Sequence, residues 1–530
     1  PFYFSRLRGL FGATDASFHA FEAAKFGVCA LLLLLPAVGL GMTVPLAARL
    51  AAGERDAVGE RVGRVLAANA LGNALGVALG LWLLPRLGLE NVLRAAAAVH
   101  LLLAGALLRP RPATAAALAA ALAVCAFAPR WDARLFARGT FRRLSAQEAD
   151  FAAFRAAQTS YKALFHQDDR EATVDVLAGD PGYVSLLVNG KADASTGTDL
   201  ATQILVGSLP LLLKPGASDM LVIGWGSGMS AGAALRHPLT RLDAVELIPA
   251  VVEGSRHFDG VSGMPRSDPR LSLHVEDAKT FLARPGPLYD AIASEPSNPW
   301  MAGVADLFSV EFYARAKSRL KAGGLFLQWF HLYEMDDAGF SLALRTLRTS
   351  FPYVTIWRVP FTRDALLVGS DAPLAPDPAA LERAFLQPEV WRDLARANIG
   401  APTTLLSLQV ASEETSAALA GRGPVNTERR PLLEYAAPKA FFRHDEVRVL
   451  AAADDRADAL RSGRLLLARH LAARGAALRP MELKDWASLY HAPEEEPGVE
   501  RVLADWRRRF PGADAEAARR LIRRSWGVVE

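Results

Sequence analysis

Long apolar runs occupy the first quarter of the chain. Phe26 to Leu50, Leu66 to Leu84 and Val92 to Leu108 are almost wholly apolar, and Ala113 to Ala128 is a shorter, weaker run. A helix needs roughly 20 apolar residues to cross the hydrocarbon core of a bilayer. The pattern therefore predicts a transmembrane region over residues 1–130, with three strong spans and a fourth, weaker one. Since the chain begins at Pro1 rather than Met, we expect further residues to precede it.

The charges that flank these runs predict an orientation. With four spans, the N-terminal flank, the loop at 85–91 and everything after residue 129 share one side of the membrane. That side carries the basic residues Arg6, Arg8, Lys25, Arg86, Arg130, Arg134, Arg138, Arg142 and Arg143, against Arg49, Arg55, Arg61, Arg64, Arg109 and Arg111 on the other. Cytoplasmic loops are enriched in arginine and lysine, so we expect the rest of the chain on the cytoplasmic side.

Strand patterns replace the long apolar runs from about residue 172. Thr173 to Leu177 and Tyr183 to Val188 predict a β-hairpin joined by Gly179-Asp-Pro-Gly. Five further strand-like runs alternate with helical stretches, at Met220–Ile223, Leu242–Val245, Leu271–Val275, Ala291–Ser294 and Leu325–Trp329. Such a βαβ rhythm predicts an α/β, Rossmann-like domain with a mostly parallel sheet. Beyond about Pro373, alanine, leucine and arginine in helical spacing predict a helical tail.

These patterns predict four regions. They are a transmembrane region at 1–130, a linker with the β-hairpin at 131–215, a Rossmann-like nucleoside-binding domain at 216–372 and a mostly helical region at 373–530. Composition adds little. The 60 basic and 56 acidic residues nearly balance, which gives no reason to expect a nucleic-acid partner. Two cysteines, both inside apolar runs, provide neither a disulfide framework nor a cysteine-based metal site, and we expect no metal.

A glycine-rich turn follows the first strand of the Rossmann-like domain. Gly224, Gly226 and Gly228, with Ser227 between the last two, allow backbone amides to approach a ligand at the start of a helix. About twenty residues on, Glu246 ends the second strand, where its carboxylate can accept hydrogen bonds from both ribose hydroxyls. A dinucleotide such as NAD is the nearest competing ligand.

Two features favour an S-adenosyl nucleoside over a dinucleotide. The glycines follow a Gly-x-Gly-x-Gly pattern, and Asp277 and Ala278 come directly after the third strand. Asp277 can accept a hydrogen bond from an adenine amino group, or cap the helix that begins at Ala278, and the two roles are compatible.

The fourth strand ends in a proline-rich turn that holds an acid. Glu295, Asn298 and Trp300 lie in the sequence Glu-Pro-Ser-Asn-Pro-Trp at the carboxyl edge of the sheet, where open α/β folds bind ligands. Glu295 is therefore the foremost candidate for catalysis. Residues after the fifth strand are expected to line the same edge, namely Gln328, His331, Tyr333 and Glu334.

In their order along the chain, these motifs resemble the spermidine synthase (polyamine aminopropyltransferase) family, specifically its bacterial, membrane-attached, multi-span branch. The segments that carry the resemblance are Val188-Asn-Gly-Lys-Ala-Asp-Ala-Ser-Thr-Gly-Thr-Asp, Gly224-Trp-Gly-Ser-Gly, Val245-Glu-Leu, Glu276-Asp-Ala, Ser294-Glu-Pro-Ser-Asn-Pro-Trp through Tyr313, and Asn426-Thr-Glu-Arg-Arg-Pro-Leu-Leu-Glu-Tyr.

The resemblance implies roles for single residues. Glu295 stands where the family has its catalytic aspartate, Glu246 meets the ribose and Asp277 the adenine, and Gln203 falls at a cofactor-side glutamine. Two acids usual in the family are absent, since Ser227 and Asn298 stand in their places. Candidates to replace their charges in substrate binding are Asp193, Asp199, Asp306 and Glu334, with Tyr333 at the same edge.

We therefore expect a membrane-anchored, aminopropyltransferase-like enzyme. It would use decarboxylated S-adenosylmethionine and a small-molecule amine acceptor, in the bacterial inner membrane, and it could form a homo-oligomer. One alternative is a methyltransferase of the same fold that uses S-adenosylmethionine, because Ser227 removes a repulsion against that cofactor's carboxylate. The other is a non-catalytic membrane module that binds the nucleoside.

Overall fold

The computed structural model describes residues 2–52, 58–107, 111–142, 148–179, 182–458 and 463–475, with isolated positions between 500 and 519. Arg55, Arg109 and Arg143 from the charge comparison, and most of the predicted helical tail after 475, lie outside the described residues. The chain divides into two compact units. One comprises Pro1–Leu177 with Leu187–Lys191, and the other Ala178–Leu186 with Ala192–Glu530.

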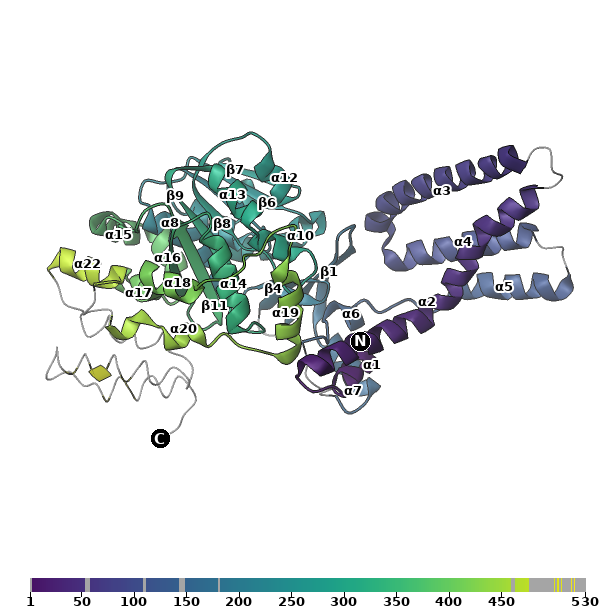
Figure 1. The fold of residues 1–530 in the computed structure, drawn as a ribbon, viewed down its shortest axis with the longest axis horizontal. Coiled ribbons are helices and arrows are strands. Elements are labelled where there is room, and N and C mark those ends of the chain that lie inside the picture. The colour runs from purple at the N-terminus through teal and green to yellow at the C-terminus, as the bar shows by residue number, and fades with distance from the viewer. Residues whose placement is uncertain are drawn as a thin grey trace. The chain divides into compact units, whose positions relative to one another are not determined.

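Long helices dominate the first unit (Figure 1). They are α2 (Asp15–Ala52), α3 (Val58–Leu87), α4 (Leu89–Leu107) and α5 (Pro112–Phe127), accompanied by the short helices α1 (Phe2–Arg8), α6 (Arg134–Ala137) and α7 (Phe151–Thr159). By length and composition, two stretches of the described residues can cross a membrane, Asp15–Ala52 and Val58–Leu107, and α5 is a shorter apolar helix. Leucines on α2 stay uncovered, with Leu31 80% and Leu35 82% exposed.

Polar contacts bring the start of α4 and the end of α5 together. Arg94 pairs with Glu90 at 2.5 Å and donates to the carbonyl oxygens of Cys125, Ala128 and Pro129. Glu90 also accepts a hydrogen bond from the backbone N–H of Trp131 at 3.0 Å. The α3–α4 turn and the chain after α5 therefore lie at the same end of this helical hairpin, as the four-span arrangement requires.

A four-stranded sheet follows the helices. Its strands are adjacent in chain order, β1 (Lys162–Asp168), β2 (Thr173–Gly179), β3 (Tyr183–Val188) and β4 (Lys191–Ser195). The predicted hairpin is the central pair β2–β3. The outer strands β1 and β4 were not predicted, because their mixed polar sequences lack the apolar alternation on which the prediction rested.

The second unit is built on an eight-stranded sheet in the order β12-β10-β11-β9-β8-β5-β6-β7. The five predicted strands are confirmed as its parallel part, namely β5 (Asp219–Ile223), β6 (Arg241–Glu246), β7 (Leu271–Val275), β8 (Tyr289–Ser294) and β9 (Leu320–His331). Three antiparallel strands extend it beyond β9, β11 (Asp364–Ser370), β10 (Tyr353–Arg358) and β12 (Gln409–Ala411). The strand β12 lies inside the region predicted to be helical.

Helices cover both faces of this sheet (Figure 1). On one face lie α8 (Leu200–Leu213), which contacts β8, β9 and β11, and α9 (Met229–Leu235), which contacts β5 and β6. On the other face, Leu221 and Ile223 pack in one hydrophobic cluster with residues of α12 (Ala278–Ala283), α13 (Val310–Ser318) and α14 (Asp337–Leu347). Strands buried on both faces are apolar throughout, which explains the continuous apolar runs in the sequence.

The remaining elements connect or flank these layers. They are α10 (Pro249–Gly254), η2 (Ser255–Phe258), α11 (Asp259–Ser262), η3 (Pro265–Ser267), η4 (Val304–Phe308), α15 (Pro378–Phe385), α16 (Pro388–Arg396), α17 (Pro402–Leu406), α18 (Glu413–Ala420), α19 (Leu432–Arg443), α20 (Val449–Ala452), η5 (Asp455–Asp458) and α22 (Leu466–Arg474). The buried Asn426 fixes the C-terminal region to η4, since its amide donates to the carbonyl oxygens of Ala305 and Phe308 and its side-chain oxygen accepts from Leu433.

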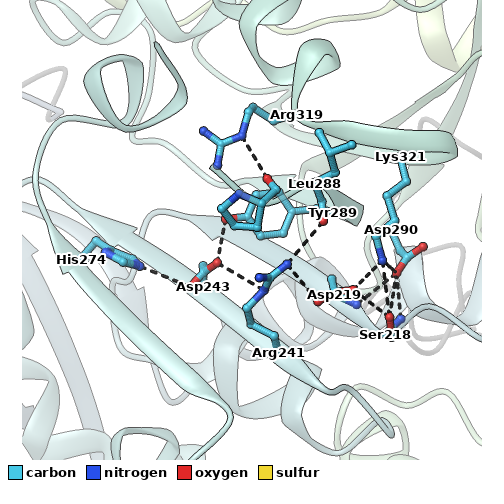
Figure 2. A network of polar contacts seen from close by, with 11 residues as sticks. Ser218, Asp219, Arg241, Asp243, His274, Leu288, Tyr289, Asp290, Arg319 and Lys321 are labelled. Atoms are coloured by element: carbon cyan, nitrogen blue, oxygen red, sulfur yellow. Dashed lines mark hydrogen bonds and ion pairs between the residues drawn. The ribbon is translucent and has the colours of Figure 1, made fainter. Parts of the chain in front are cut away.

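A polar network joins the amino-terminal ends of the parallel strands (Figure 2). Lys321 of β9 contacts the carboxylates of Asp219 at 2.5 Å and Asp290 at 2.8 Å, and Asp290 also accepts from the backbone N–H of Ser218. Burial alone would raise the pKa of Asp290, but the hydrogen bonds from Lys321, Ser218 and Asp219 outweigh it and bring the pKa to about 2. The network fixes the edge of the sheet opposite to the one where the predicted site residues lie.

Candidate active site

The predicted site residues lie where the direction of the sheet connections reverses. From β5 the chain moves to β6 and β7 on one side and then returns to β8 on the other side of β5. Open α/β sheets bind ligands at the carboxyl ends of strands that flank such a switch point. The glycine turn directly follows β5 and Glu295 directly follows β8, so the two motifs share this edge.

Gly224 allows these two loops to approach each other closely. Its backbone N–H donates to the carbonyl oxygen of Val245, and the backbone N–H of Glu295 donates to that of Ile223. A Cβ atom at Gly224 would lie 2.4 Å from the carbonyl oxygen of Glu295, and its φ of +96° also disfavours other residues. Gly226 and Gly228 also have positive φ values, and α9 begins directly after Gly228. The prediction that a glycine loop leads from a strand into a helix is confirmed.

Ser227 links the glycine loop to α8. Its hydroxyl donates to the side-chain oxygen of Gln203, and the amide nitrogen of Gln203 donates to the carbonyl oxygen of Ser195 at 3.1 Å. Both side chains are buried, with Ser227 2% and Gln203 4% exposed. At the loop position where the resemblance implies an acid, this chain therefore has a neutral hydroxyl that links the loop to the first turn of α8.

Glu246, at the end of β6, is hydrogen-bonded to the glycine loop. It accepts hydrogen bonds from the backbone N–H groups of Trp225 at 3.1 Å and Ile248 at 2.9 Å. Burial raises the pKa of Glu246, and these backbone donors oppose the increase. Glu246 lies beside the glycine loop, which suits a contact with the ribose, and that contact stays a prediction. The hydrogen bond between Glu246 and the backbone of the loop was not predicted from the sequence.

Asp277 caps the helix α12, as one of its two predicted roles requires. Its carboxylate accepts from the backbone N–H of Thr280 at 2.8 Å and from the Thr280 hydroxyl at 3.0 Å. Ala278, the first residue of α12, is 9% exposed. The adenine contact of both residues remains a prediction.

Glu295 has a strongly perturbed carboxyl group at this edge. Ser230, in the first turn of α9, donates its hydroxyl to the Glu295 carboxyl at 2.6 Å. Burial of the carboxyl raises its pKa to about 8, against the Ser230 hydrogen bond, and the negative charges of Asp364, Asp199 and Asp193 raise it further. Such a carboxyl can exchange a proton near neutral pH, which an ordinary glutamate cannot.

Three of the predicted substrate residues, Asp193, Asp199 and Asn298, lie in or near the turn after Glu295. Asp193 of β4 accepts from the Ser297 hydroxyl at 2.8 Å. Asp199 is the N-cap residue of α8. Asn298 is fully buried, and neither atom of its amide has a hydrogen-bond partner among the described residues.

The residues predicted after β9 differ in their surroundings. Gln328 is buried, and its amide nitrogen donates to the carbonyl oxygen of Ser294, the residue before Glu295, at 3.4 Å. Nδ1 of His331 donates to the backbone carbonyl oxygen of Tyr333, and the Tyr333 backbone forms an isolated β-bridge with Glu446. Asp306, considered as a replacement charge, instead pairs with Lys279 at 2.6 Å, so its charge is already neutralised.

Two residues of this site escaped the sequence analysis, Ser230 and Asp364. Asp364 begins β11, opposite His331 of β9, and accepts from the Thr202 hydroxyl of α8 at 2.6 Å. A signal for Ser230 existed, since a hydroxyl in the turn after a glycine loop lies near any ligand there. For Asp364 there was none, because its strand was not predicted.

Comparison with known proteins agrees with the motifs. Residues 200–362 match the family described as the Spermine/spermidine synthase domain. A spermidine synthase from Coffea arabica is 30% identical over 159 residues, which cover 29% of this chain and 50% of that protein. A polyamine aminopropyltransferase from Korarchaeum cryptofilum is 29% identical over 182 residues, which cover 33% of this chain and 56% of that protein. The chain thus spans about half the length of the curated relatives it matches.

Among solved structures, a probable spermidine synthase from Corynebacterium glutamicum is 19% identical, with a TM-score of 0.37. The likeness covers 50% of this chain and 96% of that protein. The resemblance to the spermidine synthase family is therefore confirmed, on the sequence match, for the domain that holds the glycine loop and Glu295. Its membrane-attached branch stays a prediction.

Proposed function

We propose that this chain, whose residues 200–362 form a spermine/spermidine synthase domain, is a membrane-anchored, aminopropyltransferase-like enzyme. It transfers an aminopropyl group from decarboxylated S-adenosylmethionine to an amine acceptor. The observation that carries the proposal is the Glu295 carboxyl, held beside the glycine loop with its pKa raised to about 8.

The raised pKa suits Glu295 to the task of a general base. An aliphatic ammonium with a pKa near 10.4 would lose its proton to an ordinary glutamate at a cost of about 8 kcal/mol. With the pKa of Glu295 at about 8, the same transfer costs about 3 kcal/mol. Proton transfer is efficient when the pKa values of donor and acceptor approach each other. The raised pKa of Glu295 therefore makes it easier to form the neutral amine, which is the nucleophile.

The transfer itself is a single displacement. Glu295 takes one proton from the acceptor ammonium, and the freed nitrogen lone pair attacks the propyl carbon bonded to the sulfonium sulfur. The carbon–sulfur bond breaks with its electron pair on sulfur, which leaves as neutral methylthioadenosine. Ser230 supports this step, because its hydrogen bond at 2.6 Å fixes the orientation of the Glu295 carboxyl.

Methyl transfer is a second candidate because of Ser227. An acid at this loop position would repel the carboxylate of ordinary S-adenosylmethionine, whereas the neutral Ser227 hydroxyl is bonded to Gln203 and repels nothing. We rank this candidate second because a methyltransferase has no evident use for the cluster of carboxylates around Glu295.

The two products distinguish the candidates. The full chain, purified in detergent, is incubated with either form of the cofactor and with a set of mono- and diamines, and the nucleoside products are separated by chromatography. Aminopropyl transfer gives methylthioadenosine with the decarboxylated cofactor alone, and Glu295→Gln lowers its rate by at least about a hundredfold. S-adenosylhomocysteine as the product would instead establish methyl transfer.

A matched control separates loss of the base from a general loss of activity. Glu389 of α16 is 54% exposed on its side chain and pairs with Arg392, so Glu389→Gln should retain full activity. Equal activity of Glu295→Gln and Glu389→Gln would show that Glu295 is not the base. Nucleoside binding without any product would leave the non-catalytic module as the remaining alternative.

The membrane anchor is supported by the two apolar stretches Asp15–Ala52 and Val58–Leu107 and by the contact between Glu90 and Trp131. We place the catalytic domain on the cytoplasmic side of the bacterial inner membrane. A fusion of alkaline phosphatase after Trp131 should be inactive, and a fusion of a cytoplasmic fluorescent protein at the same point should fluoresce. The opposite pair of results would reverse the orientation.

A further inference from the structure

One segment beyond the matched domain contacts both loops that border the edge of the sheet where Glu295 lies. It comprises residues 426–447, namely the motif that begins at Asn426, the helix α19 and the turn that follows this helix. We call this segment the C-terminal strap. Its motif contributes to the family resemblance, but it lies outside residues 200–362 and its sequence indicates no role in the reaction.

The C-terminal strap fixes the far end of residues 295–303, which we call the catalytic turn. This turn begins at Glu295, whose backbone N–H donates to the last carbonyl oxygen of β5 at 2.8 Å. Further along, the ring of Trp300 stacks on that of Phe441 of α19, with ring centroids 4.4 Å apart. The backbone N–H of Gly303 then donates to the Glu434 carboxylate of the same helix at 3.0 Å. The turn is therefore attached to the sheet at its start and to α19 at its end.

The helix α19 is itself fixed by packing. Leu433 and Ala437 are fully buried in the hydrophobic cluster that covers one face of the sheet, and Phe442 is buried as well. Glu434 and Phe441 are seven residues apart, which is about two helical turns, so they project from the same side of the helix. A packed helix thus presents both contacts to the catalytic turn, and side chains on such elements are held more precisely than side chains on loops.

The end of the C-terminal strap contacts the loop after β9. His444 follows α19 with a φ of +55°, in the left-handed region that histidine enters more often than most residues, and the chain reverses there. The next residues then run beside the loop. The backbone N–H of Met335 donates to the Asp445 carbonyl oxygen at 3.1 Å, and that of Val447 to the Leu332 carbonyl oxygen at 2.9 Å. Two of the predicted site residues lie in the stretch between these bonds.

We propose that the C-terminal strap positions the catalytic turn for proton transfer, with Phe441 and Glu434 as positioning residues. They hold Trp300 and Gly303, and through them the turn that carries the Glu295 carboxyl. This inference rests on the proposed function, since it adds positioning residues to the same reaction.

Loss of these contacts should affect the base and spare the nucleoside. A turn that is free at one end admits water, which hydrates the Glu295 carboxyl and lowers its pKa, and it also displaces the carboxyl from the acceptor. The glycine loop is bonded to Glu246 and Gln203 instead, so binding of the nucleoside should not depend on the strap.

Kinetics of the full chain in detergent test the proposal, with decarboxylated S-adenosylmethionine and 1,4-diaminobutane. Phe441→Ala should lower kcat by about tenfold, since small displacements of a catalytic group are costly. It should also move the acid limb of the kcat–pH profile to lower pH by about one pH unit, while calorimetric binding of methylthioadenosine stays unchanged. Phe441→Tyr keeps the stacked ring and should retain both rate and profile. An unchanged kcat, or a lower kcat with an unchanged profile, would overturn the proposal.

Glu434 and Tyr435 supply a second variant and a control on the same helix. Glu434→Ala removes the acceptor for the Gly303 N–H and should act in the same direction as Phe441→Ala. Glu434→Gln keeps an accepting oxygen and should resemble wild type. Tyr435 is 71% exposed, so Tyr435→Ala should leave kcat and the pH profile unchanged.

A thermal comparison tests the positioning without turnover. The gain in Tm from Glu295→Gln is measured at pH ~5 and pH ~8, in wild type and in Phe441→Ala, and its growth with pH should be about a third smaller in the variant. Lost packing alone would lower the Tm at both pH values and leave this growth unchanged. Equal growth would overturn the role of the strap even if the products establish aminopropyl transfer. Smaller growth would support that role even if wild type forms no product and the proposed function fails.

Discussion

Replacement of Glu295 by glutamine should stabilise the protein while it abolishes activity. Burial and three nearby acids raise the pKa of Glu295 from 4.5 to about 8, so its ionised form is disfavoured in the folded state. Glutamine is close in shape, and its side-chain oxygen can still accept the hydrogen bond from Ser230, but it carries no charge. The variant therefore removes the electrostatic cost and keeps the packing.

The magnitude depends on pH, and its sign follows from the direction of the shift. Below pH 4.5, Glu295 is neutral in the folded and the unfolded chain, and the raised pKa costs nothing. Between 4.5 and 8 only the unfolded chain ionises readily, so the wild-type protein loses stability as pH rises. A shift of about 3.5 units gives a cost of about 0.8 kcal/mol at pH ~5 and about 4.4 kcal/mol at pH ~8. These are upper values, since the residue as a whole is partly exposed while its carboxyl is enclosed.

Thermal unfolding of the full chain in detergent measures this difference. At roughly 2–4 °C per kcal/mol, the Tm advantage of Glu295→Gln over wild type should grow by about 7–14 °C between pH ~5 and pH ~8. Glu389→Gln, at an exposed carboxylate, should show no such growth. A Tm difference for Glu295→Gln that does not change with pH would refute the raised pKa and, with it, the argument for Glu295 as a base.

Three further predictions concern the frame of the site. Asp290→Asn should lower the free energy of unfolding by about 2.4 kcal/mol at neutral pH, since the folded pKa of Asp290 is about 2 against 3.8. That stabilisation is complete above pH 3.8 and disappears as pH falls through 2, which denaturant titrations at two pH values would reveal. Gly224→Ala should weaken methylthioadenosine binding in calorimetry by more than about tenfold, because the added Cβ lies 2.4 Å from the Glu295 carbonyl oxygen. Asn426→Ala should destabilise the protein by about 2–3 kcal/mol in thermal unfolding, because it leaves the carbonyl groups of Ala305 and Phe308 without their donor.

The parts of the site that the sequence predicts are those that follow a strand directly. Gly224, Glu246 and Glu295 each follow or end a buried strand, and parallel strands bring their carboxyl ends to one edge of a sheet whatever their order. Asp277 shows the limit of such reasoning. Its position after β7 was correct, but the contact that the structure provides is the local cap of α12.

Roles that depend on strand order or on distant contacts could not be predicted. Ser230 reaches Glu295 across 65 residues of sequence, and Thr202 reaches Asp364 across 162. β11 reads as an ordinary apolar run, and no periodicity in the sequence predicts its antiparallel pairing with β9, which brings Asp364 to the carboxyl edge. Short β12 was missed for a similar reason, since three residues carry no period.

The neutral residues Ser227 and Asn298 have different consequences for the two substrates. From the sequence, both changes appear as a loss of negative charge from the site. In the structure, the charges of Asp193, Asp199 and Asp364 raise the pKa of Glu295, so negative charge is retained around the proposed base. At residue 227 of the glycine loop, by contrast, a neutral hydroxyl replaces the charge. The choice of donor should then respond to Ser227 and Gln203, and the choice of acceptor to Asp364. Ser227→Asp should change the preference between the two cofactor forms while the ratio of diamine to monoamine turnover stays the same, whereas Asp364→Asn should do the reverse. If either variant changed both the cofactor preference and the amine preference, the same charges would determine the choice of donor and of acceptor.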